Sequence, residues 1–302
     1  MKLPKEIKRV SVPPIKCQGI KTKLVPFIMS SIRWSDANGT WIEPFAGSGV
    51  VVFNVKPQRA IINDANPFII GFYKAIYDGT ITPEIVRDYL RVEGRTLLLD
   101  NRKGTDSYFY RVRERFNETG SLLDFLFLSR SCFNGVMRFN GKGKFNVPFC
   151  QKPDRFRQAY ITKITNQVAS IKKAMTDKDW IFTSNDWKQT IELAEDGDFV
   201  YLDPPYIGRH VDYFNHWTEK EAKDLAKTTQ ALPENVGFAL SMWKENKYRV
   251  NGHIEEEWAG NVERSFAHYY HIGSTESLRN EMQEALIIRQ GCESEEAQVI
   301  IE

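Results

Sequence analysis

Short apolar runs separated by a glycine-rich turn mark residues 40–66. Thr40–Glu43 predicts a strand, Val50–Val55 a short helix that ends before Pro57, and Ala60–Asn63 a second strand. Two strands joined through a helix form a βαβ unit, which requires parallel strands covered by helices. The pattern therefore predicts a parallel sheet with helices packed on it.

A longer stretch, from Pro67 to Ala174, has mainly helical character. Apolar residues recur at helical spacing in Phe68–Tyr77, Tyr108–Phe116 and Leu122–Phe133. The polar loop Asn134–Pro153, which contains several glycines and prolines, interrupts this pattern. We therefore expect a group of helices with one long loop between them.

Strand signals return after the helical stretch. They lie in Trp180–Thr183, Phe199–Leu202, Val236–Leu240, Val262–Tyr269 and Glu284–Ile288. Thr218 and Glu221 have the spacing of a capping box, which predicts a helix running toward Leu232. An α/β pattern that stops and resumes predicts one α/β domain, residues 1–66 and 175–302, with a helical insertion at 67–174.

Basic residues are concentrated in the predicted insertion. Residues 101–173 contain 15 Lys and Arg but 5 Asp and Glu, a net charge of +10, whereas the whole chain carries +2. A basic segment on an otherwise acidic scaffold favours a surface that faces a polyanion. The alternative is a set of solvated helix faces, and charge alone does not separate the two.

Composition excludes several other classes of protein. The chain of 302 residues is 42% hydrophobic and 26% charged, which is typical of a globular protein. Neither a membrane-spanning run of roughly 18 apolar residues nor an apolar signal core is visible. Four scattered cysteines without a CxxC pair predict a reduced, cytoplasmic protein without a thiolate metal site.

The first candidate site is the turn from Glu43 to Gly49, which reads Glu-Pro-Phe-Ala-Gly-Ser-Gly between a strand and a helix. Glycines at such a turn let a cofactor approach the backbone closely. Asp64 ends the next strand, 17 residues after Gly47, close to the spacing at which an acid binds ribose hydroxyls. The alternatives are a simple tight turn for the glycine motif and a helix N-cap for Asp64.

The second candidate site is the tetrapeptide Asp203-Pro204-Pro205-Tyr206, directly after the apolar strand Phe199–Leu202. The prolines fix the backbone and leave its carbonyls free to accept hydrogen bonds. Two acceptors beside the flat ring of Tyr206 suit a planar base with an exocyclic amine. Accepting both amine hydrogens would turn the nitrogen lone pair toward an electrophile.

Together these motifs carry a resemblance to a known family. A Phe-x-Gly-x-Gly turn followed by Asp-Pro-Pro-Tyr resembles the S-adenosylmethionine-dependent amino methyltransferases of DNA. Pro14–Lys21, PIKCQGIK, is similar to the N-terminal cofactor motif of the Dam-like (D12 class) adenine methyltransferases. Arg130–Phe149, RSCFNGVMRFNGKGKFNVPF, resembles the DNA-recognition hairpin of that class. The likeness extends over essentially the whole chain.

The resemblance implies a Rossmann-like S-adenosylmethionine-dependent methyltransferase sheet with an inserted target-recognition domain. It assigns Lys21 and Cys17 to the methionine end of the cofactor, Asp64 to its ribose and Phe182–Asp186 to the border of its adenine. The cofactor residues that it implies are Cys17, Lys21, Glu43, Phe45, Gly47, Gly49, Asp64, Asp186 and Asp203. The catalytic residues that it implies are Asp203, Pro204, Pro205 and Tyr206.

The resemblance also implies DNA contacts at Asn134, Val136, Arg138 and Pro148, and we further expect Lys16, Lys142 and Lys144 to contact DNA. The chemistry of the hairpin agrees, because Arg138 can bond guanine O6 and N7 and the lysines can bind phosphates. Lys152, Arg155 and Arg157 are further expected phosphate contacts. Phe133, Phe139 and Phe145 are expected to pack in the core, as is Cys132.

The predicted reaction is methyl transfer from S-adenosylmethionine to the N6 amine of an adenine flipped out of double-stranded DNA. It needs neither a metal nor a covalent intermediate, and the resemblance favours a site that begins GAT. We expect a monomer without membrane contact, acting beside a separate cognate restriction endonuclease or as an orphan or phage enzyme. The alternatives are a non-catalytic or partner-dependent DNA-binding protein, a cytosine-N4 enzyme, and a methyltransferase of RNA or protein.

Overall fold

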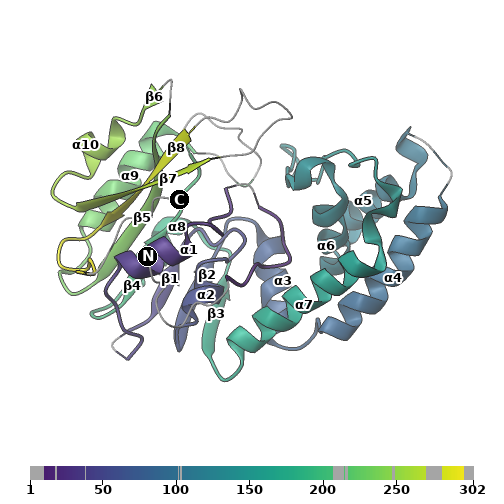
Figure 1. The fold of residues 1–302 in the computed structure, drawn as a ribbon, viewed down its shortest axis with the longest axis horizontal. Coiled ribbons are helices and arrows are strands. Elements are labelled where there is room, and N and C mark those ends of the chain that lie inside the picture. The colour runs from purple at the N-terminus through teal and green to yellow at the C-terminus, as the bar shows by residue number, and fades with distance from the viewer. Residues whose placement is uncertain are drawn as a thin grey trace.

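The computed structural model describes residues 10–17, 19–37, 39–100, 102, 104–206, 214, 217–246, 249–269 and 281–295. Within these residues a twisted sheet stands at one side of the molecule and a group of helices at the other (Figure 1). None of the described helices is both long and apolar enough to cross a membrane.

The strands form one sheet in the order β3-β2-β1-β4-β5-β8-β7, with β6 paired to β5. Their bounds are β1 (Trp41–Glu43), β2 (Arg59–Asn63), β3 (Asp179–Thr183), β4 (Phe199–Leu202), β5 (Gly237–Asn246), β6 (Arg249–Val250), β7 (Val262–Tyr269) and β8 (Glu281–Ile288). The predicted α/β class and the predicted strands are confirmed, with ends that shift by a few residues. β6 was not predicted.

The sheet is parallel only from β3 to β5. β8 lies antiparallel to both β5 and β7. The prediction of a parallel sheet is therefore correct for only part of the sheet. Eleven residues separate Tyr269 from Glu281, and a parallel crossover needs a dozen or more. The short connection therefore accounts for the antiparallel pairing at this edge.

The order of the strands reverses between β1 and β4, which are parallel neighbours: Trp41 pairs with Phe199 and Ile42 with Val200. In α/β sheets a crevice forms at such a reversal, outside the carboxyl ends of the strands. The glycine turn follows β1 and the Asp-Pro-Pro-Tyr turn follows β4. The topology therefore brings the two candidate motifs to the same edge of the sheet.

The helices fall into a group against the sheet and a group beyond it. Their bounds are α1 (Val25–Ser31), α2 (Val52–Val55), α3 (Pro67–Tyr77), α4 (Pro83–Leu99), α5 (Tyr108–Thr119), α6 (Leu122–Ser131), α7 (Gln158–Met175), α8 (Trp187–Ile191), α9 (Glu219–Gln230) and α10 (His253–Glu257). Short 3₁₀ turns lie at Gly104–Asp106, Phe133–Gly135 and Pro153–Phe156.

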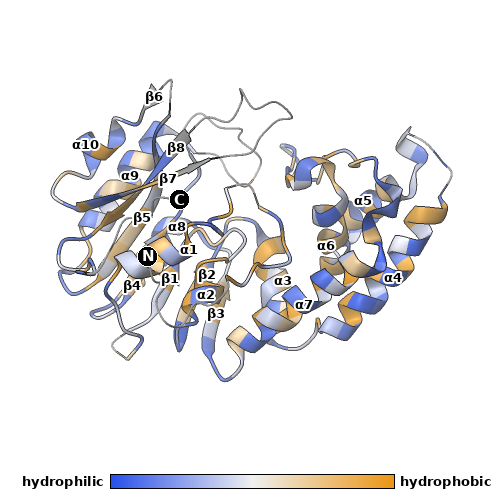
Figure 2. Cartoon of the chain, in the orientation of Figure 1, coloured by the Kyte–Doolittle hydropathy of each residue, from blue (hydrophilic) through white to orange (hydrophobic). Residues whose placement is uncertain are grey.

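Local sequence explains where the main helices begin. Asn66 accepts a hydrogen bond from Phe68 N–H at the start of α3, and Thr82 accepts one from Ile85 N–H at the start of α4. The predicted capping box of Thr218 and Glu221 is present at the start of α9. Figure 2 shows hydrophobic and hydrophilic residues side by side on α4 and α7, as amphipathic helices require.

Two apolar cores lie on either face of the sheet. One runs without a break from the sheet into α3, α4, α5, α6 and α7. The other lies between β4, β5 and β8 and the helices α9 and α10. The helical segment is thus continuous with the first core. That residues 67–174 form a separate domain stays a prediction.

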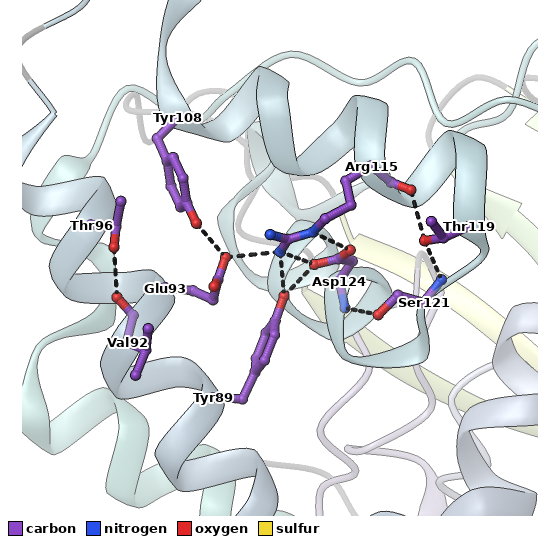
Figure 3. Close-up of polar contacts among 9 residues, drawn as sticks. All are labelled: Tyr89, Val92, Glu93, Thr96, Tyr108, Arg115, Thr119, Ser121 and Asp124. Atoms are coloured by element: carbon purple, nitrogen blue, oxygen red, sulfur yellow. Dashed lines mark hydrogen bonds and ion pairs between the residues drawn. The ribbon is translucent and has the colours of Figure 1, made fainter.

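A polar cluster ties α4, α5 and α6 together (Figure 3). The Arg115 guanidinium donates through Nε to Asp124 at 2.8 Å and through Nη2 to Glu93 at 2.9 Å. The Tyr108 hydroxyl donates to Glu93 at 2.7 Å, and the Tyr89 hydroxyl donates to Asp124. Each buried carboxylate is therefore paired with a cation and a phenol from a neighbouring helix.

Candidate active site

A cavity of about 470 Å³ opens where β1, β2 and β4 end. Eleven of the twelve residues predicted to bind cofactor or to catalyse line it, namely Cys17, Lys21, Glu43, Phe45, Gly47, Asp64, Asp186, Asp203, Pro204, Pro205 and Tyr206. The remaining one, Gly49, does not. Segments that are distant in sequence thus form one site.

The two glycines of the turn have different roles. Gly47 and Gly49 both have positive φ angles, 50° and 68°, which favour glycine. A Cβ on Gly49 would lie 2.5 Å from the Phe53 ring. Gly49 therefore permits the helix after the turn to pack, rather than lining the cavity.

Asp64 holds the glycine turn in place. One carboxylate oxygen accepts a hydrogen bond from Gly47 N–H at 2.7 Å, and the other accepts one from Asn66 N–H at 2.8 Å. Asn66, not Asp64, is the N-cap of α3. The alternative interpretation of Asp64 as the helix cap is therefore wrong.

Lys21 is the buried centre of the polar contacts around the tetrapeptide. Its ammonium lies 2.9 Å from Asp203 Oδ1 and donates to the Tyr206 hydroxyl at 3.0 Å. The Tyr206 hydroxyl in turn donates to Glu284 Oε2 at 2.6 Å. Burial alone would lower the pKa of Lys21, but Asp203, Tyr206 and Glu284 hold it well above its usual value. Lys21 is therefore a permanent cation.

The same contacts set the acidity of Asp203. Burial raises the pKa of its carboxyl, and the nearby Lys21 ammonium opposes that rise. A half-buried carboxylate that pairs with one cation keeps a lone pair available as an acceptor. Sequence reasoning missed Glu284, which is 2% exposed. The available signal was a carboxylate within the apolar strand β8, because a charged residue in such a strand needs a partner.

Glu43 lies beneath the cavity at the end of β1. It is 2% exposed and accepts a hydrogen bond from the Trp41 indole at 2.8 Å. Burial raises the pKa of its carboxyl to about 8, although the Trp41 hydrogen bond opposes this. At neutral pH the Glu43 carboxyl therefore carries a proton.

Aromatic rings form one wall of the cavity. The Phe45 ring lies 6.2 Å from that of Trp187, with an angle of 30° between the two planes, and 5.4 Å from that of Trp217, edge to face. Asp186 caps α8 by accepting from Lys188 N–H at 2.9 Å. This wall suits a flat ring, and the two tryptophans were not predicted.

Asn63 ties together the ends of β1, β2 and β3 beside the cavity. Its amide donates to the Pro44 carbonyl at 3.0 Å and to the Asn185 carbonyl at 3.1 Å. Its oxygen accepts from Asn185 N–H and from the Thr183 hydroxyl. A polar residue at the end of an apolar strand was the available signal, and sequence reasoning did not use it.

Residues 130–149 form a looped excursion with two antiparallel bridges, Cys132 to Phe149 and Phe139 to Phe145. Phe139, Phe145, Val147 and Phe149 are buried in it. The exposed residues among the predicted DNA contacts are Asn134, Arg138, Lys142, Lys144 and Pro148, while Val136 is half-buried. None of them lines the cavity.

The interior of this hairpin differs in one respect from expectation. Phe139, Phe145 and Cys132 are buried as predicted, but the Phe133 side chain is 55% exposed. Asn134 follows it with a φ of 52°, and that left-handed turn directs the chain outward. The expectation that Phe133 packs in the core is therefore wrong.

Two residues, Asn117 and Phe139, anchor the hairpin. The Asn117 side chain on α5 accepts from Phe145 N–H at 2.8 Å and donates to its carbonyl at 3.1 Å. The Phe139 ring stacks on Phe68 at 5.6 Å and meets Phe214, from the segment after Tyr206, at 4.8 Å. Phe214 also lines the cavity, so the hairpin and the cavity share a wall.

Lys16 lies beside the hairpin rather than in the cavity. A Cβ on Gly135 would lie 2.5 Å from Lys16 Cδ. Burial lowers the pKa of Lys16 to about 8, with Arg130 and Arg155 adding to the effect. Lys16 therefore belongs to a group of close positive charges.

One group in the described part of the chain has a geometry that could hold a metal ion, His253, Glu256 and Glu257. None of the three lines the main cavity. The Glu257 carboxylate lies 3.8 Å from the Lys223 ammonium, so this carboxylate already has a positively charged neighbour.

Comparison of the sequence with known proteins identifies a matching family. Residues 18–259 match the family described as D12 class N6 adenine-specific DNA methyltransferase. The chain is 30% identical to a type II methyltransferase, M1.LlaDCHI, of Lactococcus lactis subsp. cremoris over 65% of this chain and 66% of that protein. It is 32% identical to a DNA adenine methylase of Serratia marcescens over 60% of this chain and 63% of that protein.

The match spans less than two thirds of the length of these two relatives. A third, the type II methyltransferase M.MjaIII of Methanocaldococcus jannaschii, is 27% identical over 79% of this chain and 85% of its own. Among solved structures, the rRNA methyltransferase aviRa of Streptomyces viridochromogenes aligns over 85% of this chain and 77% of its own, with a TM-score of 0.32 and 11% identity.

Proposed function

The chain belongs to the D12 class N6 adenine-specific DNA methyltransferase family, and from this premise we propose that it methylates the N6 amine of an adenine in double-stranded DNA. The methyl donor is S-adenosylmethionine, whose sulfonium supplies an electrophilic methyl group. The observation that carries the proposal is the meeting of the glycine turn, Asp64 and the Asp-Pro-Pro-Tyr turn in one cavity.

The donors and acceptors of the cavity fit this cofactor. The Asp64 carboxylate suits a ribose diol, and the wall of Phe45 and Trp187 beside Asp186 suits an adenine ring. The Lys21 ammonium suits a carboxylate at the methionine end, with Cys17 and Glu43 near it. A cavity of about 470 Å³ lies within the usual size range of cofactor sites.

The tetrapeptide would hold the target base. Asp203 and the Pro204 carbonyl accept the two hydrogens of the N6 amine, so its lone pair turns toward the methyl group. Tyr206 stacks on the base, and its hydroxyl is fixed by Lys21 and Glu284 at 3.0 Å and 2.6 Å. The amine proton leaves afterwards to Asp203 or to water. Positioning and fixed charges then provide most of the rate enhancement.

The helical segment 67–174 would recognise the DNA. Arg138 is exposed on the hairpin and would bond one guanine, while Lys142 and Lys144 would bind phosphates. Lys16 would contact the DNA beside the hairpin. Asn134, Val136 and Pro148 would touch the bases or wedge between them.

Three runs of sequence support a finer proposal for the target. VPPIKCQGIKTKLVP, DFLFLSRSCFNG and DPPYIGRHVDYFN resemble the EcoRV modification methyltransferase. We therefore propose a site that begins GAT, with GATATC favoured over GATC. The protein would act as a monomer, either beside a separate cognate restriction endonuclease or as an orphan or phage enzyme.

The test is to incubate plasmid DNA that lacks adenine methylation with the protein and S-adenosylmethionine, and to read modified bases by single-molecule sequencing. N6-methyladenine at one short motif is the expected result. Tight, salt-sensitive DNA binding without modification would overturn the proposal and favour a non-catalytic DNA-binding protein.

Substitution of Asp203 separates chemistry from binding. Asp203→Ala removes an acceptor of the target amine but leaves the glycine turn and the hairpin intact. We expect at least a hundredfold loss of methyl transfer while DNA affinity stays within a few-fold of wild type. Asp154→Ala, at an exposed carboxylate, is the control, and turnover retained by Asp203→Ala would exclude its proposed role.

A further inference from the structure

Helix α4 carries a group of exposed apolar side chains. Ile85, Val92, Leu98 and Leu99 are four of the ten exposed large hydrophobic residues in the part of the chain that the structure describes. Val92 and Leu99, 63% and 65% exposed, are the most exposed of these ten. Single apolar residues are ordinary on a protein surface, whereas a contiguous group marks a site of interaction. α4 is therefore a candidate for contact with another molecule.

Three of these residues lie on one side of the helix. Ile85, Val92 and Leu99 follow one another at intervals of seven residues, which is close to two turns of an α-helix. They form an apolar stripe along nearly the whole of α4, which runs from Pro83 to Leu99. A repeat of seven residues is the spacing at which one helix packs along another.

The opposite side of α4 provides its contacts within the protein. The buried residues of the helix are Val86, Leu90, Glu93, Gly94 and Leu97. Figure 1 shows α4 on the outer side of the helical group, away from the sheet, and no residue of α4 lines the main cavity. The apolar stripe is thus needed neither for the core nor for the candidate active site.

Charged residues beside the apolar stripe are divided between the two halves of α4. Glu84 and Asp88 lie in the first half and Arg91 and Arg95 in the second, and all four are exposed. Arg87 lies 3.5 Å from Asp88, but a pair at the surface contributes little. A second α4 that runs in the opposite direction would bring each acidic half to a basic half, and such complementarity sets the orientation of two partners.

Reversal about Val92 makes the apolar stripe complementary to itself. Ile85 and Leu99 lie seven residues on either side of Val92, so each would face the other residue in a second copy of α4. Asp88 lies four residues before Val92 and Arg95 three residues after it, so these opposite charges would be neighbours. The two Val92 side chains would meet at the centre.

We propose that α4 binds the α4 of a second copy of this chain, antiparallel and with a two-fold axis at Val92. The same surface serves both copies, as a two-fold dimer requires. α4 has 17 residues, so the helices meet over about 26 Å, and interfaces below about 1,200 Å² are weak and transient. Each copy keeps its own cavity, so the catalytic unit is still a monomer. This inference does not depend on the proposed function.

The first test is analytical ultracentrifugation over a range of protein concentrations, without DNA or cofactor. We expect reversible dimers with a dissociation constant weaker than about 1 µM. Val92→Glu would place two carboxylates together on the axis and should abolish the dimer. Leu193→Glu, at an apolar residue that is 51% exposed on another part of the surface, is the matched control and should associate as wild type does.

Two results of this experiment would overturn the inference. One is a wild-type chain that is still monomeric at about 1 mM, which would leave the apolar stripe to a different partner. The other is a dimer that Val92→Glu does not weaken, because association would then use another surface.

Charge reversal tests the antiparallel geometry. Asp88→Arg makes both of these positions basic in each copy, and Arg95→Asp makes both acidic, so each variant alone should associate at least about tenfold more weakly than wild type. An equimolar mixture of the two variants should recover dimers, because each supplies the charge that the other lacks. A mixture that associates as weakly as the separate variants would show that Asp88 and Arg95 do not face each other.

Cross-linking locates the axis directly. In Val92→Cys the new thiols of two copies would lie together, so mild oxidation by dioxygen should give a disulfide-linked dimer. Leu193→Cys is the matched control, and wild type, with four free cysteines, gives the background. Equal cross-linking of Val92→Cys and Leu193→Cys would exclude an axis at Val92.

Discussion

Lys21 connects two segments that are 185 residues apart, because its ammonium donates to the Tyr206 hydroxyl while it pairs with Asp203. A buried cation without such acceptors would be strongly unfavourable. The pairing therefore fixes where the N-terminal motif packs, as well as the charge beside the target base. Local folding and chemistry depend here on the same side chain.

Glu43 gives a prediction about stability and pH. Its pKa of about 8, against 4.5 for an ordinary glutamate, means that the folded protein keeps a proton that the unfolded chain releases. The free energy of unfolding should therefore fall as pH rises from about 4.5 to about 8. Glu43→Gln, which stays neutral, should flatten this decline by at most about 5 kcal/mol.

The measurement is urea unfolding at a series of pH values without cofactor or DNA. Glu234→Gln, at an exposed position, should retain the wild-type decline. A Glu43→Gln curve parallel to that of wild type across this range would contradict the assignment of a protonated Glu43.

Lys16 gives a prediction about DNA binding and pH. Its pKa of about 8 arises from burial, from Arg130 and Arg155, and is partly offset by the facing Cys132 and Cys150. DNA affinity should fall as pH rises through about 8, because Lys16 then loses its charge. Lys16→Arg should remove this dependence, since a guanidinium stays charged.

Titration of a labelled duplex by fluorescence anisotropy from about pH 7 to about pH 9 covers the transition. Lys142→Arg, at an exposed hairpin position, should keep the wild-type dependence. Equal pH profiles for wild type and Lys16→Arg would show that Lys16 does not face the DNA.

The sequence predicted the residues that belong to recognisable motifs, but not their supporting partners. Glu284 contributes through its contact with the Tyr206 hydroxyl, and the sequence of a strand does not reveal which side chain will lie beside it. Phe133 was misplaced because its exposure follows from the backbone turn at Asn134. Hydrophobicity alone carries no information about that turn.

At the scale of elements, periodicity identified most strands and the helical character of residues 67–174. The antiparallel edge of the sheet was not foreseen, because βαβ reasoning applies to strands joined by helices and β7 and β8 are joined by a short connection. The hairpin was recognised by resemblance rather than periodicity. Its rigidity depends on Asn117 of α5, which lies outside the motif.

The cluster in Figure 3 predicts how strongly these helices depend on one another. Arg115→Met would leave the Asp124 side chain, 1% exposed, without its cation. Removing one partner of a buried ion pair is strongly destabilising, and we expect the free energy of unfolding to fall by about 3 kcal/mol. Urea unfolding followed by circular dichroism measures this.

Arg157→Met is the control, because its partner Asp154 has a side chain that is 52% exposed. Such a surface pair contributes about 0–1 kcal/mol. If Arg115→Met were no more destabilising than this control, the cluster would have no part in holding α4, α5 and α6 together.

At the scale of the whole molecule, the basic segment 101–173 predicts a strong dependence of DNA affinity on salt. Each neutralised phosphate adds about −0.9 to the slope of log affinity against log salt. Lys142→Gln and Lys144→Gln should each reduce the slope by about one and weaken all sequences alike. Arg138→Ala should instead lower discrimination at one guanine, by about 1–3 kcal/mol.

The control for the salt series is Lys220→Gln on α9, whose ammonium lies 3.5 Å from Asp224. Its slope should match that of wild type. Slopes that do not change in either hairpin variant would favour the simpler interpretation of these lysines as solvated side chains.

The position of β1 in the sheet has a consequence for synthesis on the ribosome. Trp41 pairs on one side with Ala60 and on the other with Phe199. Because β4, which contains Phe199, is translated much later than β1, one edge of β1 has no partner until then. At about 5–20 residues per second, one edge of β1 stays open for on the order of ten seconds. The helical segment has mostly local contacts and can form during that time, whereas the sheet has a high contact order. A nascent chain that stalls before β4 would expose an unpaired edge, and such edges promote aggregation.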